Sequence, residues 1–259
     1  MAGYLCHPLV RRGLLLEHGC EKTHNDAMRE FFEEQGIDYS RFGCASVQLD
    51  GGLDKVTDKV VSWFLADCDS EATPRRASLE DVRLALTAET GTPDHLAAGC
   101  AALAARIVHF GGTVVVPENS HLLQTKAFVG ALLADRSQPH ATIAYGERFL
   151  KPGLHVMQTP TDHPVETLTG LGATGVEVML VCIAKAVLQS HPMVPVIQVS
   201  GTELSQDLDL VVTSDDAHRA AADMLGLTIR VLSRQYSPKL LAQGNTDFQM
   251  TRGLLGVSL

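Results

Sequence analysis

The feature that most constrains the fold is the alternation of short apolar runs with helical patterns between residues 84 and 232. Apolar runs predict strands at 84–88, 113–117, 153–158, 176–183 and 194–199, and the segments 93–110, 121–133, 164–174 and 215–232 read as helices. Strands that alternate with helices favour a mostly parallel sheet with right-handed crossovers. The chain is therefore predicted to be an α/β protein whose sheet is flanked by helices.

A smaller unit precedes this region. Residues 13–16 and 45–49 read as strands, and 25–35 and 53–66 as helices. The polar, proline-bearing segment 67–77 is the best candidate boundary. We expect residues 1–77 to form a small α/β module and residues 78–259 a larger, Rossmann-like domain of catalytic type.

Composition narrows the possible partners. The formal charge is −9, only 5% of residues are aromatic, and no basic stripe is present, so a nucleic-acid surface is disfavoured. No segment reaches the roughly 18 apolar residues that span a bilayer, so we expect a soluble, cytoplasmic protein without a membrane partner. The six cysteines are scattered singly, which favours reduced thiols over a disulfide framework.

Polar clusters follow four of the predicted strands. They occupy residues 19–25, 89–92, 118–121 and 161–163. Ligands of open α/β sheets bind beyond the carboxyl ends of the strands, so these clusters are the candidate site. Asp162 and His163 stand out because Pro164, directly after them, is placed to be the first residue of a helix.

Several phrases of the sequence, in order, resemble a known family. They are Gly19-Cys-Glu, Gly111-Gly-Thr-Val-Val-Val-Pro-Glu, Gly153-Leu-His-Val-Met-Gln-Thr-Pro, Glu166-Thr-Leu-Thr-Gly-Leu, Gly175-Val-Glu-Val-Met-Leu, Pro192-Met-Val-Pro-Val-Ile-Gln-Val and Asp207-Leu-Asp. Together they resemble the carboxyl-terminal catalytic region of the altronate/galactarate dehydratase family over roughly residues 14–215. The resemblance implies a metal-dependent carbon–oxygen lyase that converts a small anionic sugar acid to a 2-keto-3-deoxy acid.

The chain departs from the family in two places. Where the family has a Gly-Gly-Ser-Asp-type phrase, this chain reads Glu89-Thr-Gly91-Thr92. Family members also carry a preceding part of the catalytic region, whereas this chain starts just before Gly19. Either a partner chain or another copy supplies that part, or the chain is a fragment, or it is a binding module with altered chemistry. The apolar run 248–257 is compatible with packing on such a partner.

Dehydration of a sugar acid needs a base, an acid and a cation that holds the enediolate. Cys20, Glu21, His24 and Glu118 are the expected metal ligands, and a thiolate beside imidazole and carboxylate suits a divalent ion such as Fe(II). Lys22 is a candidate base or carboxylate partner. The alternative for this cluster is that Thr23 or Asn25 simply caps a helix whose first turn carries acids.

Asp162 and His163 are the candidates for proton transfer. Glu89, Gly91, Thr92 and Thr161 are the candidates for substrate binding, because glycine-rich backbone at a helix start suits a carboxylate. The simpler alternatives are that Asp162 is a helix cap and that Thr92 and Pro93 merely begin the next helix.

Overall fold

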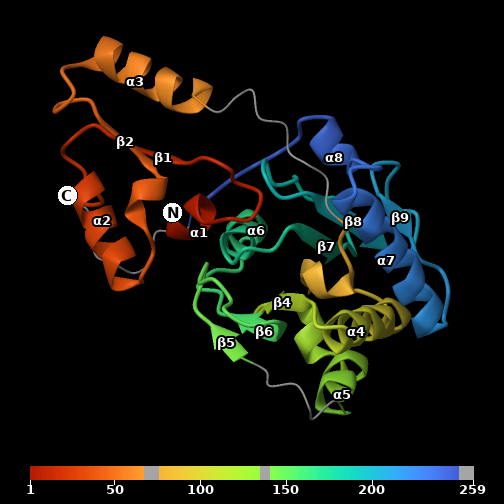
Figure 1. Ribbon diagram of the computed structural model, residues 1–259. Coiled ribbons are helices and arrows are strands. Elements are labelled where there is room, and N and C mark those ends of the chain that lie inside the picture. The colour runs from red at the N-terminus through yellow and green to blue at the C-terminus, as the bar shows by residue number, and fades with distance from the viewer. Residues whose placement is uncertain (67–75, 135–140, 251–259) are drawn as a thin grey trace. The chain divides into compact units, whose positions relative to one another are not determined.

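The computed structural model describes residues 1–66, 76–134 and 141–250, without the side chains of 131–134. The chain divides into two compact units, Met1–Arg76 and Ala77–Leu259 (Figure 1), and each is described here by itself. The expected linker at 67–77 and the apolar run 248–257 lie mostly outside the described residues. Among the described helices, none is both long enough and apolar enough to cross a membrane.

A seven-stranded parallel sheet forms the centre of the second unit. Its strands are β3 (Arg83–Ala88), β4 (Thr113–Pro117), β5 (Ala141–Ile143), β6 (Gly153–Met157), β7 (Val178–Cys182), β8 (Val196–Ser200) and β9 (Leu210–Val211). They lie in the order β5-β6-β4-β3-β7-β8-β9, and every pairing is parallel. The predicted α/β fold with a parallel sheet is confirmed. The short edge strands β5 and β9 were not predicted.

Helices cover both faces of this sheet. They are η2 (Leu79–Asp81), α4 (Asp94–His109), η3 (His121–Gln124), α5 (Lys126–Ala134), α6 (Pro164–Ala173), α7 (Ala217–Leu232) and α8 (Lys239–Ala242). Leu84 and Leu86 of β3 belong to the core under α4 and α7, whereas Ala85 belongs to the core under α6. This division follows from the two-residue repeat of a strand, whose successive side chains point to opposite faces.

The strand order reverses beside β3. From β3 the chain moves through α4 to β4 on one side, and it later returns through α6 to β7 on the other side. The crossovers after β3 and β7 therefore run in opposite directions. This arrangement opens a crevice at the carboxyl ends of these two strands, which is where doubly wound sheets bind ligands.

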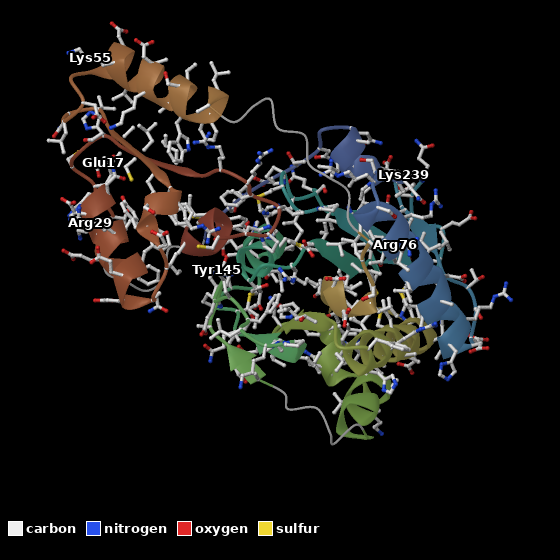
Figure 2. The ribbon with its side chains drawn as sticks, in the orientation of Figure 1. Glu17, Arg29, Lys55, Arg76, Tyr145 and Lys239 are labelled. Atoms are coloured by element: carbon white, nitrogen blue, oxygen red, sulfur yellow. The ribbon has the colours of Figure 1, made fainter. Side chains whose placement is uncertain are left out.

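A close contact fixes α6 beside this crevice. A Cβ at Gly170 would lie 2.2 Å from Cε2 of Tyr145 (labelled in Figure 2), so only glycine leaves room for the ring. The Tyr145 hydroxyl donates a hydrogen bond of 2.6 Å to the carbonyl of Glu166 in the first turn of α6. The helix is thereby held from its side as well as from the sheet.

The first unit is built on two parallel strands, β1 (Leu14–Glu17) and β2 (Gly43–Ser46). Its other elements are α1 (Ala2–Leu5), α2 (Asn25–Glu34), η1 (Tyr39–Arg41) and α3 (Leu53–Leu65). Its core is small and consists of Met28, Phe32 and Phe42. The buried carboxylate of Glu17 (labelled in Figure 2) accepts the backbone N–H of Asn25, which ties the end of β1 to the start of α2.

Most predicted elements differ from the structure by one or two residues at their ends, and two differ for a specific local reason. The expected strand 45–49 is wrong beyond Ser46, because Asp50 closes a turn there: its carboxylate accepts the Ser46 N–H, and its own N–H donates to the Ser46 carbonyl. The expected helix 121–133 is broken at Thr125, whose hydroxyl donates to the Leu122 carbonyl and accepts the Phe128 N–H. In both places a short polar side chain competes with the regular backbone pattern.

Candidate functional site

A pocket of about 130 Å³ lies at the carboxyl ends of β3 and β7 in the second unit. The strands contribute Thr87, Ala88 and Val181, and Thr87 lies opposite Val181 in the β3–β7 register. The remaining lining comes from the segments after β3, β4, β6 and β7: Glu89, Thr90, Asn119, Asp162, Pro164, Thr167, Leu168 and Leu188. The lining of the pocket therefore combines apolar side chains with hydroxyl, amide and carboxylate groups.

Glu89 links the segment after β3 to the segment after β7 through hydrogen bonds. Its carboxylate oxygen Oε2 accepts the backbone N–H of Ala184 at 2.8 Å and that of Lys185 at 3.2 Å. Its own N–H donates to the carbonyl of Cys182 at the end of β7. The side chain thus occupies backbone donors that would otherwise face an anionic ligand.

Asn119 joins the loop after β6 to the start of α6. Its side-chain nitrogen donates to the Thr161 carbonyl at 3.0 Å and to the Thr167 hydroxyl at 3.1 Å. Thr161 is not one of the lining residues, but its hydroxyl accepts the N–H of His163 at 3.0 Å. Asn119 belongs to the polar cluster 118–121, which the sequence placed at the candidate site without giving Asn119 a role of its own. The contact with residues 161 and 167, far away in the sequence, is what reveals that role.

Asp162 is the most accessible carboxylate of the pocket. It is exposed, and within the described part of the chain its carboxylate has no hydrogen-bond or ion-pair partner. It is not the cap of α6, because His163 is the N-cap residue and makes no side-chain capping bond. Pro164 is the first helical residue, as predicted. Asp162 and the exposed His163 are therefore both available to a ligand or to solvent.

Gly91 and Thr92 form a tight turn after β3. The Thr92 hydroxyl and N–H both donate to the carbonyl of Glu89, at 2.8 Å and 3.1 Å. Gly91 has φ of +101°, a conformation that favours glycine. α4 begins at Asp94 with Pro93 as its cap, one residue later than the expected start at residue 93. Neither Gly91 nor Thr92 is among the described residues that line the pocket.

Glu118 is exposed at the end of β4. Its carboxylate accepts the backbone N–H of Thr159 at 3.3 Å, a long hydrogen bond that joins the loops after β4 and β6. It is not among the described lining residues either. The structure thus brings Glu89 and Asp162 to one pocket, with Thr161 supporting it and Glu118 outside it.

The first unit holds the remaining candidates in the loop between β1 and α2. The Glu21 carboxylate accepts the backbone N–H groups of His18, Gly19 and Cys20 at 2.7, 2.9 and 3.1 Å. These backbone hydrogen bonds lower the pKa of Glu21 from its usual 4.5 to about 2, because they stabilise the ionised form. The loop is therefore closed around its own carboxylate.

The other candidate residues of this loop do not share a common partner. Cys20 and His24 contact only residues nearby in the sequence. His24 Nδ1 accepts the N–H of Ala27 at 3.2 Å, so His24, rather than Thr23 or Asn25, caps α2. Cys20 Sγ lies 3.6 Å from His18 Nδ1. Cys20, Lys22 and His24 are all exposed. The cluster is polar and accessible, but Glu21 and His24 bind backbone N–H groups of the loop and do not converge on one point.

The expected metal ligands are Cys20, Glu21 and His24 of the first unit and Glu118 of the second. In residues 1–66, 76–134 and 141–250, no three side chains of His, Cys, Asp or Glu are grouped closely enough to hold a metal ion. The oxygen of Glu21 and the Nδ1 of His24 are both engaged with backbone N–H groups. These residues therefore do not fit a preformed ion site. Dependence on a divalent metal stays a prediction from the sequence.

Comparison with known proteins gives no assignment. No protein-family model matches the chain, and no curated protein sequence matches it. The similarity to the altronate/galactarate dehydratase family therefore stays a prediction, and any function is argued from the residues of the chain.

Proposed function

We propose that this chain is a hydro-lyase that dehydrates a sugar acid of the altronate or galactarate type to a 2-keto-3-deoxy acid. The ordered phrases between residues 14 and 215 support the family resemblance. The single observation that carries the proposal is the accessible Asp162 carboxylate in a pocket where the strand order reverses. Pockets at such points are the usual ligand sites of doubly wound sheets.

Dehydration requires two proton transfers. A base removes the proton from the carbon next to the substrate carboxylate, and an acid protonates the hydroxyl that leaves from the neighbouring carbon as water. The resulting enol then tautomerises to the 2-keto-3-deoxy acid. We assign these transfers to Asp162 and His163, which are adjacent and exposed after β6. Asn119 and Thr161 position them, because their hydrogen bonds fix the loop that carries both residues.

The apolar lining of the pocket supports this assignment. Leu168, Val181 and Leu188 line the pocket together with its polar groups and offer a bound substrate an apolar surface. A low-polarity surrounding strengthens each hydrogen bond made by the polar groups. Lys22 lies in the first unit and stays a candidate base or carboxylate partner from the sequence alone. No step is assigned to a metal, because the described residues form no ligand set for one.

A second function is favoured by the same finding. A non-catalytic or partial subunit, which binds a small acid and completes its site with a partner chain or another copy, would need no ligand set of its own. Glu89 also points this way, because it fills backbone donors that a catalytic site would offer to substrate. A lyase acting on another hydroxy acid is a variant of the first proposal.

An anaerobic dehydration assay of the full chain separates these functions. Altronate, galactarate and simpler 2,3-dihydroxy acids are incubated with the protein, with and without Fe(II), and 2-keto-3-deoxy products are measured. Product formation supports the lyase, and its loss on adding a chelator supports the metal requirement. A folded protein that binds these acids without turnover supports the subunit. If the protein neither binds nor converts these acids, both proposals are contradicted.

A further inference from the structure

One wall of the pocket comes from the segment after β7. Residues 183–189 of this segment form neither helix nor strand, and they include the lining residue Leu188. The segment is fixed at both ends. At its start two backbone N–H groups donate to Glu89, and at its end the N–H of Ser190 donates to the carbonyl of Asn245 at 2.9 Å. Neither contact involves Leu188, which lies between them.

Gln198 holds Leu188 from the sheet. It is a buried residue of β8, and in the β7–β8 register it lies opposite Val181, another lining residue. Its side-chain Nε2 donates to the Leu188 carbonyl at 2.6 Å, and its Oε1 accepts the Leu188 N–H at 2.7 Å. The amide thus pairs with both polar groups of one backbone residue, as a neighbouring strand would.

The chemistry of this contact requires an amide. Of the side chains as long as that of Gln198, only glutamine supplies both a donor and a good acceptor at neutral pH. A carboxylate offers acceptors alone, and a thioether offers no donor. Replacing the amide by either would leave at least one backbone group of Leu188 without its partner, which costs free energy wherever water does not take its place.

Gln198 is itself fixed on its other side by Asp209. The Asp209 carboxylate accepts the Gln198 N–H at 2.8 Å, and the Asp209 N–H donates to the Gln198 carbonyl at 2.9 Å. The same carboxylate accepts the Tyr236 hydroxyl at 2.8 Å and the Lys239 N–H at 2.9 Å. A chain of hydrogen bonds therefore runs from the residues after α7 through β8 to the wall of the pocket.

We propose that Gln198 is a positioning residue, which holds Leu188 in the wall of the pocket and thereby sets the affinity of the pocket for its ligand. Asp162 and His163, to which the proton transfers are assigned, lie on a loop that is held by other contacts. Loss of the Gln198 amide should therefore weaken binding and leave the chemical step unchanged. The choice of sugar acids as probes rests on the proposed function, whereas the contact with Leu188 does not.

Amide hydrogen exchange of the full chain, without ligand, tests the contact itself. In Gln198→Met we expect the Leu188 amide to exchange about tenfold faster, the order expected for one lost hydrogen bond, and the β4 amides to change less. Leu103→Ala is the control, because it removes core volume under α4 and lies outside the pocket lining. In that variant the β4 amides should accelerate at least as much as Leu188.

Binding and turnover of altronate and galactarate test the effect on the pocket. In Gln198→Met we expect Kd and KM to rise about five- to tenfold, because the wall is no longer held in advance of binding. We expect kcat to stay within about twofold, since a higher KM at constant kcat marks a loss of binding alone. Leu103→Ala should leave Kd and KM unchanged.

Gln198→Glu keeps the length of the side chain and serves as the second variant. Its protonated carboxyl group has one donor and one acceptor and restores both hydrogen bonds, whereas its carboxylate cannot donate to the Leu188 carbonyl. Burial favours the protonated form, so we expect wild-type affinity at about pH 5 and weakened affinity at about pH 9. The wild type, measured at the same pH values, corrects for the titration of Asp209 and of the pocket carboxylates.

The outcomes separate this inference from the proposed function. Unchanged exchange of the Leu188 amide in Gln198→Met, or wild-type affinity in Gln198→Glu at both pH values, would overturn the inference. Turnover with an unchanged KM in Gln198→Met would overturn it and leave the lyase standing. Binding that depends on Gln198 without turnover would support it and count against the lyase alone. A wild type that binds neither acid would contradict both.

Discussion

Acidic side chains follow a strand both in the loop between β1 and α2 and in the pocket at the carboxyl ends of β3 and β7. The two regions differ in what these side chains bind. In the loop, Glu21 accepts three backbone N–H groups and His24 caps a helix. In the pocket, Glu89 likewise binds two backbone N–H groups, but Asp162 has no partner among the described residues. The availability of a side chain, and not its residue type, separates a candidate catalytic group from one that holds the backbone.

The largest expected effect tests that difference through catalysis. Asp162→Asn should lower the rate of dehydration by about 10²- to 10⁴-fold, the usual cost of losing a positioned acid–base group. Asp223→Asn is the charge-matched control and should retain activity. The comparison fails if Glu21→Gln, in the loop, reduces turnover as strongly as Asp162→Asn. Initial rates of product formation give the answer.

A second prediction concerns the support of the pocket. Gly170→Ala should destabilise the second unit by about 1–3 kcal/mol, because its Cβ would overlap the ring of Tyr145. The control is Gly226→Ala in α7, where nothing lies within 4 Å of the new Cβ. That change should be neutral or stabilising, since alanine favours a helix. Chemical denaturation measures both, and equal effects would show that α6 is not fixed by Tyr145.

A third prediction compares the two backbone-binding carboxylates. Glu89→Ala should lower the free energy of unfolding by about 1–3 kcal/mol, because two N–H groups between the central strands lose a charged acceptor. Glu21→Ala should cost less, since water replaces the carboxylate in its exposed loop. Denaturant titration of both variants ranks them. A larger loss for Glu21→Ala would reverse the comparison.

The smallest expected effect is a pH dependence of the loop. The folded pKa of Glu21, about 2, lies below its usual 4.5, so its ionised form stabilises the folded loop above about pH 4.5. That stabilisation should decline as the pH falls from about 4.5 toward 2. NMR of the Gly19 and Cys20 amides follows the titration, and Glu21→Gln should abolish it. A midpoint near 4.5 in the wild type would mean that the three hydrogen bonds are absent in solution.

The sequence predicted the parallel sheet well because buried strands and capped helices leave strong local patterns. Residues 113–117 are all buried and mostly apolar, and Pro164 starts α6 as expected. The strands β5 and β9 were missed because they are short edge strands with partly exposed residues and therefore no marked pattern. Their pairing is decided by their neighbours in the sheet.

The site was less predictable, because its geometry depends on hydrogen bonds between distant segments. Strand-end reasoning placed Glu89 and Asp162 in the candidate site, and both line the pocket. It could not indicate that Glu89 binds the backbone of residues 184 and 185, since nothing in the local sequence encodes that contact. The same limit explains why the partners of Glu21 and His24 were not foreseen.

The return of β7 to the side of β3 has a consequence for synthesis of the chain. β3 pairs with β4 through a short crossover, but its other edge stays unpaired until Val178–Cys182 has been made. At usual translation speeds this interval is on the order of ten seconds. During that time an apolar strand edge is open to other nascent chains. The central strand of the finished sheet is thus the element most exposed to mispairing during translation.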